Sequence, residues 1–224
     1  MNKEALWIIA SAGNTPRVVE SLSKQKGGTP PHELFLNNTN SLALTYCTGI
    51  KKAVAQHYEW IIFCHDDIEL ECSDVFDRVK NSGFDVVGVA GTTQVKLQPP
   101  ALWHIMGGGF QSGNLRGEVK HRVNDRTTPT TRFGPFGRVI MIDGVFMAVH
   151  RDVFEAQWFD TCMPSKFHFY DLSYSLEAHL NGFKVGVADI PLIHDSPGLS
   201  DFTDEWRAGE KWFLDRYGRK EETD

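Results

Sequence analysis

The chain has 224 residues, of which 41% are hydrophobic and 23% are charged, and its formal net charge is -6. This balance is typical of a globular protein and predicts one domain, or one domain with a small extension. The negative charge disfavours general nucleic-acid binding. No apolar run approaches the roughly 18 residues of a membrane span, and the N-terminus lacks a signal-peptide layout, which favours a cytoplasmic protein.

Cysteine usage agrees with that location. The four cysteines are Cys47, Cys64, Cys72 and Cys162, and no two of them form a Cys-x-x-Cys pair. A chain of this length does not need disulfides to fold, so free thiols in a reducing compartment are expected. The same spacing disfavours a zinc site built on cysteine.

The first half of the chain alternates short apolar runs with helical patterns. Strands are expected over residues 6–10, 33–36, 60–64 and 85–90. Helices are expected over residues 16–24, from a cap at Asn40 or Ser41 to about Gln56, and over 75–81. This alternation predicts an α/β fold with a mainly parallel central sheet flanked by helices. Ligands in such folds bind beyond the carboxyl ends of the strands, so polar residues that follow apolar runs are the candidates for a site.

Residues 92–138 interrupt the pattern, because they are rich in Gly, Pro, Thr and Arg and show no clear periodicity. We expect a long loop or insertion, with Gly107 to Gly109 as a candidate hinge. Between Thr92 and Arg138 there are seven Lys or Arg and two acidic residues, a local charge of about +5. The segment is either a surface that meets anions or a solvated basic loop.

Regular structure is expected to resume with a strand over 139–142. A helix over 171–180, strands over 183–188 and 191–193, and a C-terminal helix over 203–217 follow. The predicted organisation is a domain over 1–200, with 92–138 as its long basic loop, and a helix and tail over 201–224. Trp206, Phe213 and Tyr217 recur at helical spacing, so the last helix is expected to pack on the domain as a structural element.

The strongest chemical pattern is His65-Asp66-Asp67, which directly follows the strand predicted over 60–64. Adjacent carboxylates repel each other unless a cation neutralises them. Hard oxygen ligands of this kind suit Mg²⁺ or Mn²⁺, so a divalent cation is one interpretation. The alternative is a polar turn in which Asp66 or Asp67 caps the next segment.

Three further positions follow strands or aromatic clusters. Asp171 follows Phe167 to Tyr170, and apolar surroundings raise the proton affinity of a carboxylate, which suits a general base; the alternative is a helix N-cap. His194 ends a strand and offers a nitrogen ligand to a metal, or is an ordinary loop histidine. Asp143-Gly144 also ends a strand, but alone it is a common turn pair.

Taken together, these positions resemble a known family. The likeness rests on segments 60–68 (WIIFCHDDI), 86–91 (VVGVAG), 142–151 (IDGVFMAVHR), 167–185 (FHFYDLSYSLEAHLNGFKV) and 194–198 (HDSPG). Their order and spacing resemble family-2 glycosyltransferases of the GT-A fold. The subgroup most similar to the chain is the one typified by the streptomycin-biosynthesis glycosyltransferase-like domain.

The resemblance implies roles for the metal and base residues. Asp67 matches the last acid of the family's Asp-x-Asp motif and is expected to bind Mn²⁺ or Mg²⁺. His65 takes the place of the first acid of that motif. His194 matches a late histidine that some relatives use as a metal ligand, and Asp171 matches the base that deprotonates the acceptor hydroxyl.

It also implies roles in binding the donor. Asp66 is expected near the ribose or donor sugar, and Asp143 and Gly144 line the donor-sugar and acceptor pocket. Ser11 and Asn14 fall where relatives hold the nucleobase. Cys47 stands where the subgroup often has Asn. Apart from the resemblance, Trp103 either stacks on a sugar face or is plain core.

The function implied is inverting transfer of a sugar from a nucleoside diphosphate to an acceptor hydroxyl. The acceptor is unidentified, with a glycan, a lipid carrier and a small molecule as candidates. One alternative is a non-catalytic GT-A-like module that binds nucleotide-sugar or glycan. Another is a metal phosphohydrolase built on His65 and Asp66, which is disfavoured because that class usually places its further ligands on helices.

Overall fold

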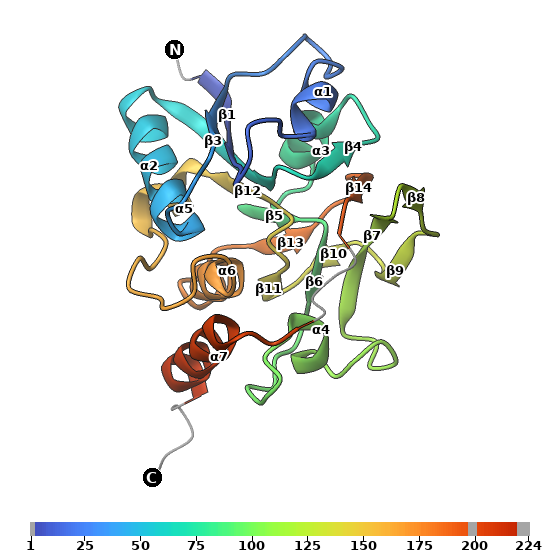
Figure 1. Ribbon diagram of the computed structural model, residues 1–224, viewed down its shortest axis with the longest axis vertical. Coiled ribbons are helices and arrows are strands. Elements are labelled where there is room, and N and C mark those ends of the chain that lie inside the picture. Colours follow the sequence, from blue (N-terminus) through green and yellow to red (C-terminus); the bar gives the residue numbers. More distant parts are fainter. Residues whose placement is uncertain (1–2, 197–200, 219–224) are drawn as a thin grey trace.

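The computed structural model describes residues 3–196 and 201–218, and these form two adjoining sheets covered by helices (Figure 1). The first sheet contains β1 (Lys3–Ala10), β2 (His32–Phe35), β3 (Tyr58–His65), β5 (Val86–Gly88), β10 (Gly137–Arg138), β12 (Phe146–His150) and β13 (Val185–Val187). The second contains β4 (Ile68–Leu70), β6 (Ala90–Thr92), β7 (Leu115–Val123), β8 (Arg126–Thr127), β9 (Thr131–Gly134), β11 (Met141–Ile142) and β14 (Leu192–His194). Within the described residues, no helix has the length and apolar composition to cross a bilayer.

The first sheet has the strand order β10-β13-β5-β12-β3-β1-β2 and confirms the α/β fold. Its strands are mixed in direction. β1 pairs in parallel with β2 and β3, and β5 with β13, but β12 runs antiparallel between β3 and β5. The prediction of a mainly parallel sheet was therefore too simple, because a strand that is apolar on both faces looks the same in either direction.

Seven helices are described: α1 (Val18–Leu22), α2 (Leu42–Ala55), α3 (Val75–Asn81), α4 (Trp103–Met106), α5 (Arg151–Ala156), α6 (Tyr170–Leu180) and α7 (Asp204–Tyr217). In Figure 1, α2 and α5 lie on one side of β1 and β3, and α1 and α3 lie on the other. The cap predicted for α2 is confirmed at Ser41, whose hydroxyl accepts a hydrogen bond from Leu44 N at 3.2 Å. Strand β3 is enclosed as predicted, with residues 61–64 fully buried.

The segment 92–138 is not the open loop that the sequence suggested. It contains α4, β7, β8, β9 and β10, and β7 is the central strand of the second sheet. Leu115, Gly117 and Val119 alternate as buried positions along β7, but glycine and charged neighbours hide this period in the sequence. The candidate hinge is packed at Gly107, where an added Cβ would lie 2.4 Å from Thr92 Oγ1.

Position 117 requires glycine, because β7 there lies very close to the residue between β5 and β6. Gly117 has φ +87°, and an added Cβ would lie 1.9 Å from the carbonyl oxygen of Val89. The register of β7 with β9 also shifts between Gly117 and Glu118, as in a β-bulge.

We expect Gly117→Ala to lower the free energy of unfolding by at least about 2 kcal/mol, because it adds a backbone clash to the cost of a left-handed conformation. Gly113→Ala is the matched control, since Gly113 has φ +73° but open space at its Cβ position. Denaturant unfolding of both variants tests this. If both variants lost the same free energy of unfolding, the contact between Gly117 and the Val89 carbonyl would not be as close as described.

The predicted C-terminal helix is present as α7. Its cap is Thr203, whose hydroxyl accepts a hydrogen bond from Trp206 N at 3.1 Å. It lies beside α6 (Figure 1). An ion pair joins the two helices, with Arg216 Nη2 2.7 Å from Glu177 Oε1. The predicted tail beyond residue 218, and residues 197–198 of the last motif, lie outside the described residues.

Candidate functional site

A cavity of about 470 Å³ opens at the carboxyl ends of β3 and β14. It is bordered by the turn between β11 and β12, by the start of α6 and by the α4 segment. His65, Asp143, Gly144, Asp171 and His194 all line it. The structure thus gathers at one cavity five candidates from four distant parts of the sequence.

His65, Asp67 and His194 form a compact group, with one ligand atom of each within 4.8 Å of the other two. His194 Nε2 lies 3.4 Å from Asp67 Oδ1, and His65 Nδ1 lies 3.3 Å from His194 Nε2. Strands β3 and β14 bring the two histidines together, and the turn after β3 presents Asp67.

The chemistry of this group fits a divalent cation. Asp67 Oδ1 is buried, and its nearest donor among the described residues is His194 Nε2, whose geometry is too poor for a regular hydrogen bond. Burial raises the pKa of Asp67, but the two imidazoles outweigh burial and hold that pKa below its usual value. A buried carboxylate oxygen without a regular hydrogen bond, facing two ring nitrogens, is a set of ligands suited to Mn²⁺ and similar ions.

His65 belongs to this group, a role that the sequence did not predict. The Tyr170 hydroxyl donates to Gly144 O at 3.1 Å, so it accepts from His65 Nε2 at 3.2 Å. The proton of the neutral imidazole is therefore on Nε2, which leaves the Nδ1 lone pair directed toward Asp67 and His194. Burial and the neighbouring His194 lower the pKa of His65, which favours this neutral form. Fixing the tautomer through the second nitrogen is how proteins orient histidine ligands.

Asp171 lies in the first turn of α6, and the N-cap position is Phe169. The N-cap alternative for Asp171 is therefore wrong. An added Cβ at Gly144 would lie 2.7 Å from Asp171 Cβ and 2.8 Å from its Oδ2, so Gly144 allows the carboxyl group to sit against the turn. Burial, and then the charge of Asp143, raise the pKa of Asp171 to about 7. A carboxyl group with that pKa is suited to accept a proton near neutral pH.

Phe169, two residues before Asp171, holds a left-handed conformation with φ 69°. For a bulky residue this conformation is strained, and it persists only where the surroundings enforce it. The ring packs on Trp206 and Phe213 of α7, with centroids 5.4 and 5.8 Å away. An added Cβ at Gly209 would lie 2.7 Å from the Phe169 ring. Helix α7 therefore holds Phe169, the N-cap residue of α6, in its strained conformation. This role exceeds the purely structural packing that the sequence predicted for the helix.

Asp143 is fixed by two donors. Trp103 Nε1 donates to Asp143 Oδ2 at 2.9 Å, and Val145 N donates to Oδ1 at 3.0 Å. Trp103 is buried, and its ring meets Phe133 edge-on with centroids 4.9 Å apart. Trp103 thus lines the cavity and anchors Asp143, so it is more than plain core, and its stacking on a sugar face stays a prediction.

The remaining candidates lie outside the cavity. The Ser11 hydroxyl donates to Asp66 Oδ2, which turns the Asp66 side chain toward the end of β1. Asn14 is exposed in the bends that follow β1. Cys47 is buried in α2, where its thiol donates to Phe159 O at 3.4 Å. All four cysteines are free, as predicted.

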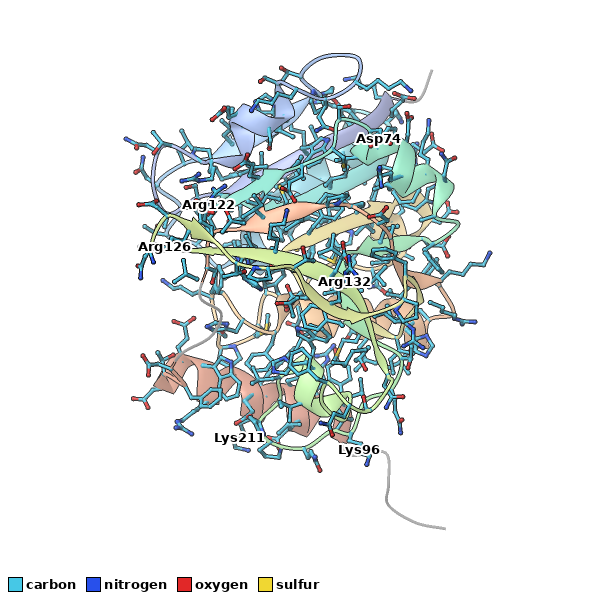
Figure 2. All side chains as sticks on the ribbon, turned by 90° about the vertical axis from the view of Figure 1, so that its right-hand side faces the viewer. Asp74, Lys96, Arg122, Arg126, Arg132 and Lys211 are labelled. Carbon is cyan, nitrogen blue, oxygen red and sulfur yellow. The ribbon has the colours of Figure 1, made fainter. Side chains whose placement is uncertain are left out.

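Most basic residues of β7 and β9 pair with acids and do not line the cavity. Arg122 pairs with Glu69 at 2.7 Å and with Asp195 at 3.0 Å, and Lys120 pairs with Glu71 at 2.6 Å. Figure 2 shows Arg122, Arg126 and Arg132 on the strands of this segment, with Lys96 apart from them toward the end that holds α7. Among the described residues that line the cavity there is no Lys or Arg.

The chain is similar to several proteins of known structure. Crystal structures that match are A197 from STIV (15% identity, 91% of this chain and 98% of that one, TM-score 0.49), S. aureus TarS (12%, 87% and 37%, TM-score 0.53) and GalNAc-T7 with UDP, GalNAc and Mn²⁺ (12%, 92% and 47%, TM-score 0.50). The chain therefore spans less than half the length of TarS and of GalNAc-T7. At these identities the likeness to those two shows the fold, which is GT-A.

No curated protein sequence matches the chain. The model of one family, described as "Glycosyltransferase like family", matches residues 31–217. This range includes β3, the turn with Asp143 and Gly144, α6 and β14, and so every side chain that lines the cavity. Because the match extends over most of the sequence, the chain belongs to this glycosyltransferase-like family.

Proposed function

We propose that the protein transfers a sugar from a nucleoside diphosphate sugar to an acceptor hydroxyl, with a divalent cation and with inversion at the anomeric carbon. The observation that carries the proposal is one cavity bordered both by Asp171, with a pKa of about 7, and by two members of the group His65, Asp67 and His194. The family and the fold support sugar transfer in general. The nearer resemblance to the streptomycin-biosynthesis subgroup, and a cytoplasmic location, are part of the same proposal.

The residues then have these roles. Asp171 accepts the proton of the acceptor hydroxyl as its oxygen attacks the anomeric carbon. Asp143, held by Trp103, and Gly144 contact the donor sugar and keep it in position against Asp171.

The nucleotide end of the donor lies near the end of β1. Ser11, with Asp66 bonded to it, and Asn14 contact the nucleoside there. His65, Asp67 and His194 hold Mn²⁺ or Mg²⁺, which when bound supplies Lewis-acid stabilisation of the diphosphate leaving group.

Calorimetric titration of the protein with UDP, GDP and dTDP, each with and without Mn²⁺, tests the proposal. We expect one nucleotide to bind at least about tenfold more tightly when Mn²⁺ is present, a difference of about 1.4 kcal/mol. The matching nucleosides, which lack the diphosphate, are the control and should show no effect of Mn²⁺. Failure of folded protein to bind any of the three nucleotides would contradict the proposal. Binding without sugar transfer or hydrolysis would favour the non-catalytic module.

A further inference from the structure

Aromatic side chains make up a large part of the lining of the cavity. Trp103, Phe110, Phe133, Phe167 and Trp206 line it. They come from four separate segments: α4 and the turn after it, β9, the loop before α6, and α7. A total volume of about 470 Å³ is in the range of pockets that hold small organic molecules.

These five side chains, which we call the aromatic wall, include one packed cluster. Phe110 and Phe133 are stacked, with centroids 5.6 Å apart and ring planes at 24°, and Trp103 meets Phe133 edge-on. Phe167 lies beside the metal-binding group, with its centroid 5.3 Å from that of His65. The aromatic wall therefore has members both at the α4 segment and beside the metal-binding group.

Two rings of this wall are open to solvent. Phe110 is 59% exposed and Phe167 is 49% exposed. Large exposed aromatic side chains that gather at a cavity mark a place where an apolar ligand surface is buried. A ligand ring placed against either of these side chains would gain both buried apolar area and aromatic contact.

The charge of the cavity restricts the ligand further. The carboxyl groups of Asp143 and Asp171 face it, and no Lys or Arg does among the residues described. Burial lowers the pKa of His104 and of His168, so both imidazoles are neutral at pH 7. His194 also lines the cavity, but its imidazole faces the Asp67 carboxylate, 3.4 Å away. Elsewhere in the cavity a phosphate group would meet carboxyl groups and neutral rings, which is an unfavourable environment for an anion.

We propose that the acceptor is a neutral, hydroxyl-bearing small molecule that carries an aromatic ring, of the phenol or aryl-glycoside class, and not a phosphate-bearing lipid carrier. The inference rests on the proposed function and names its substrate class. In the transfer step, the acceptor oxygen forms a bond to the anomeric carbon and its proton passes to the Asp171 carboxylate. The bond from that carbon to the diphosphate oxygen breaks, and its electron pair leaves with the nucleoside diphosphate.

Binding of three probes to the full chain tests the inference. Phenyl β-D-glucoside carries a ring, methyl β-D-glucoside lacks it, and farnesyl phosphate represents a phosphate-bearing lipid. Calorimetry is run on protein that holds Mn²⁺ and the nucleotide found to bind. We expect the phenyl glucoside to bind at least about tenfold more tightly than the methyl glucoside, since one favourable aromatic contact with its buried area is worth about 1.4 kcal/mol or more.

Variants of the aromatic wall test whether it causes the preference for the phenyl glucoside over the methyl glucoside. Phe110→Ala and Phe167→Ala should each reduce the preference for the phenyl glucoside by about threefold or more, and neither should unfold the protein because both rings are exposed. Phe136→Ala is the matched control, because Phe136 is 41% exposed but does not line the cavity. It should leave the preference unchanged.

The failures can be told apart. The acceptor class is overturned by any of three results: equal binding of the two glucosides, tighter binding of farnesyl phosphate, or a preference that neither wall variant changes. The proposed function still stands in these cases, as long as the nucleotide binds with Mn²⁺. Loss of nucleotide binding itself overturns the proposed function, and the acceptor class falls with it.

Discussion

Asp171→Asn is expected to lower the rate of sugar transfer by about 10²- to 10⁴-fold, the usual contribution of a general base. Asn has nearly the same shape as Asp, so the contact with Gly144 and the start of α6 remain. The substitution therefore removes only the carboxylate that accepts the proton. The rate is measured by release of nucleoside diphosphate, and wild-type kcat/KM should rise with pH through about 7, the pKa of Asp171. Retained transfer in the variant would remove Asp171 from the mechanism.

The same variant is expected to be more thermally stable than the wild type at pH 8. The folded-state pKa of Asp171, about 7, lies above its ordinary value of 3.8, so folding favours the protonated carboxyl group. That stabilisation is complete below pH 3.8 and is lost as the pH rises through about 7. Asn never carries the charge, so the gap in Tm should open between pH 4 and 7 and stay constant above.

Thermal unfolding of both proteins from pH 4.5 to 8 measures this gap. Asp125→Asn is the control, because Asp125 is exposed and its left-handed conformation, φ 59°, also suits Asn. The control should show no gap at any pH. A lower Tm for Asp171→Asn than for the wild type at pH 8 would contradict the burial argument, whatever happens to the rate.

The framework of the fold could be predicted because its signals are local. Strand β3 is a continuous apolar run, and Ser41 is followed by a helical apolar stripe; both features depend on near neighbours in the chain. The direction of β12 could not be predicted, since its partners β3 and β5 are more than fifty residues away and either direction buries the same side chains. The alternation in β7 was missed because Gly117 carries no apolar side chain.

Only part of the candidate site could be predicted, because here too only local signals can be read from the sequence. Asp67, Asp171 and His194 each follow a strand or an aromatic cluster, so position relative to local structure singled them out. The role of His65 depends on Tyr170 and Gly144, which are about 105 and 79 residues further along the chain. The support that α7 gives to Phe169 depends on Gly209, whose missing side chain leaves no pattern. Contacts between distant segments of this kind cannot be deduced from spacing.

Asp67→Asn is expected to weaken Mn²⁺ binding by more than about 100-fold, because loss of an outer partner of a metal ligand alone costs about 10- to 100-fold. The fold should survive. Asn has nearly the same shape as Asp, and its side-chain oxygen at that place can still face His194 Nε2, 3.4 Å from Asp67 Oδ1. His194→Ala should weaken Mn²⁺ binding as well, since it removes one of the two imidazoles of the group.

Electron paramagnetic resonance of free Mn²⁺, titrated with each protein, measures this affinity without any nucleotide. Asp66→Asn is the informative neighbour: its side chain bonds to Ser11 and lies away from the metal-binding group, so it should weaken nucleotide binding while Mn²⁺ alone still binds. Asp125→Asn should change neither. Unchanged Mn²⁺ affinity in Asp67→Asn would mean that the unpartnered carboxylate oxygen is not a ligand. Equal losses of Mn²⁺ affinity in Asp66→Asn and Asp67→Asn would mean that the two carboxylates act together, as adjacent acids on one cation, and that the division of roles between them is wrong.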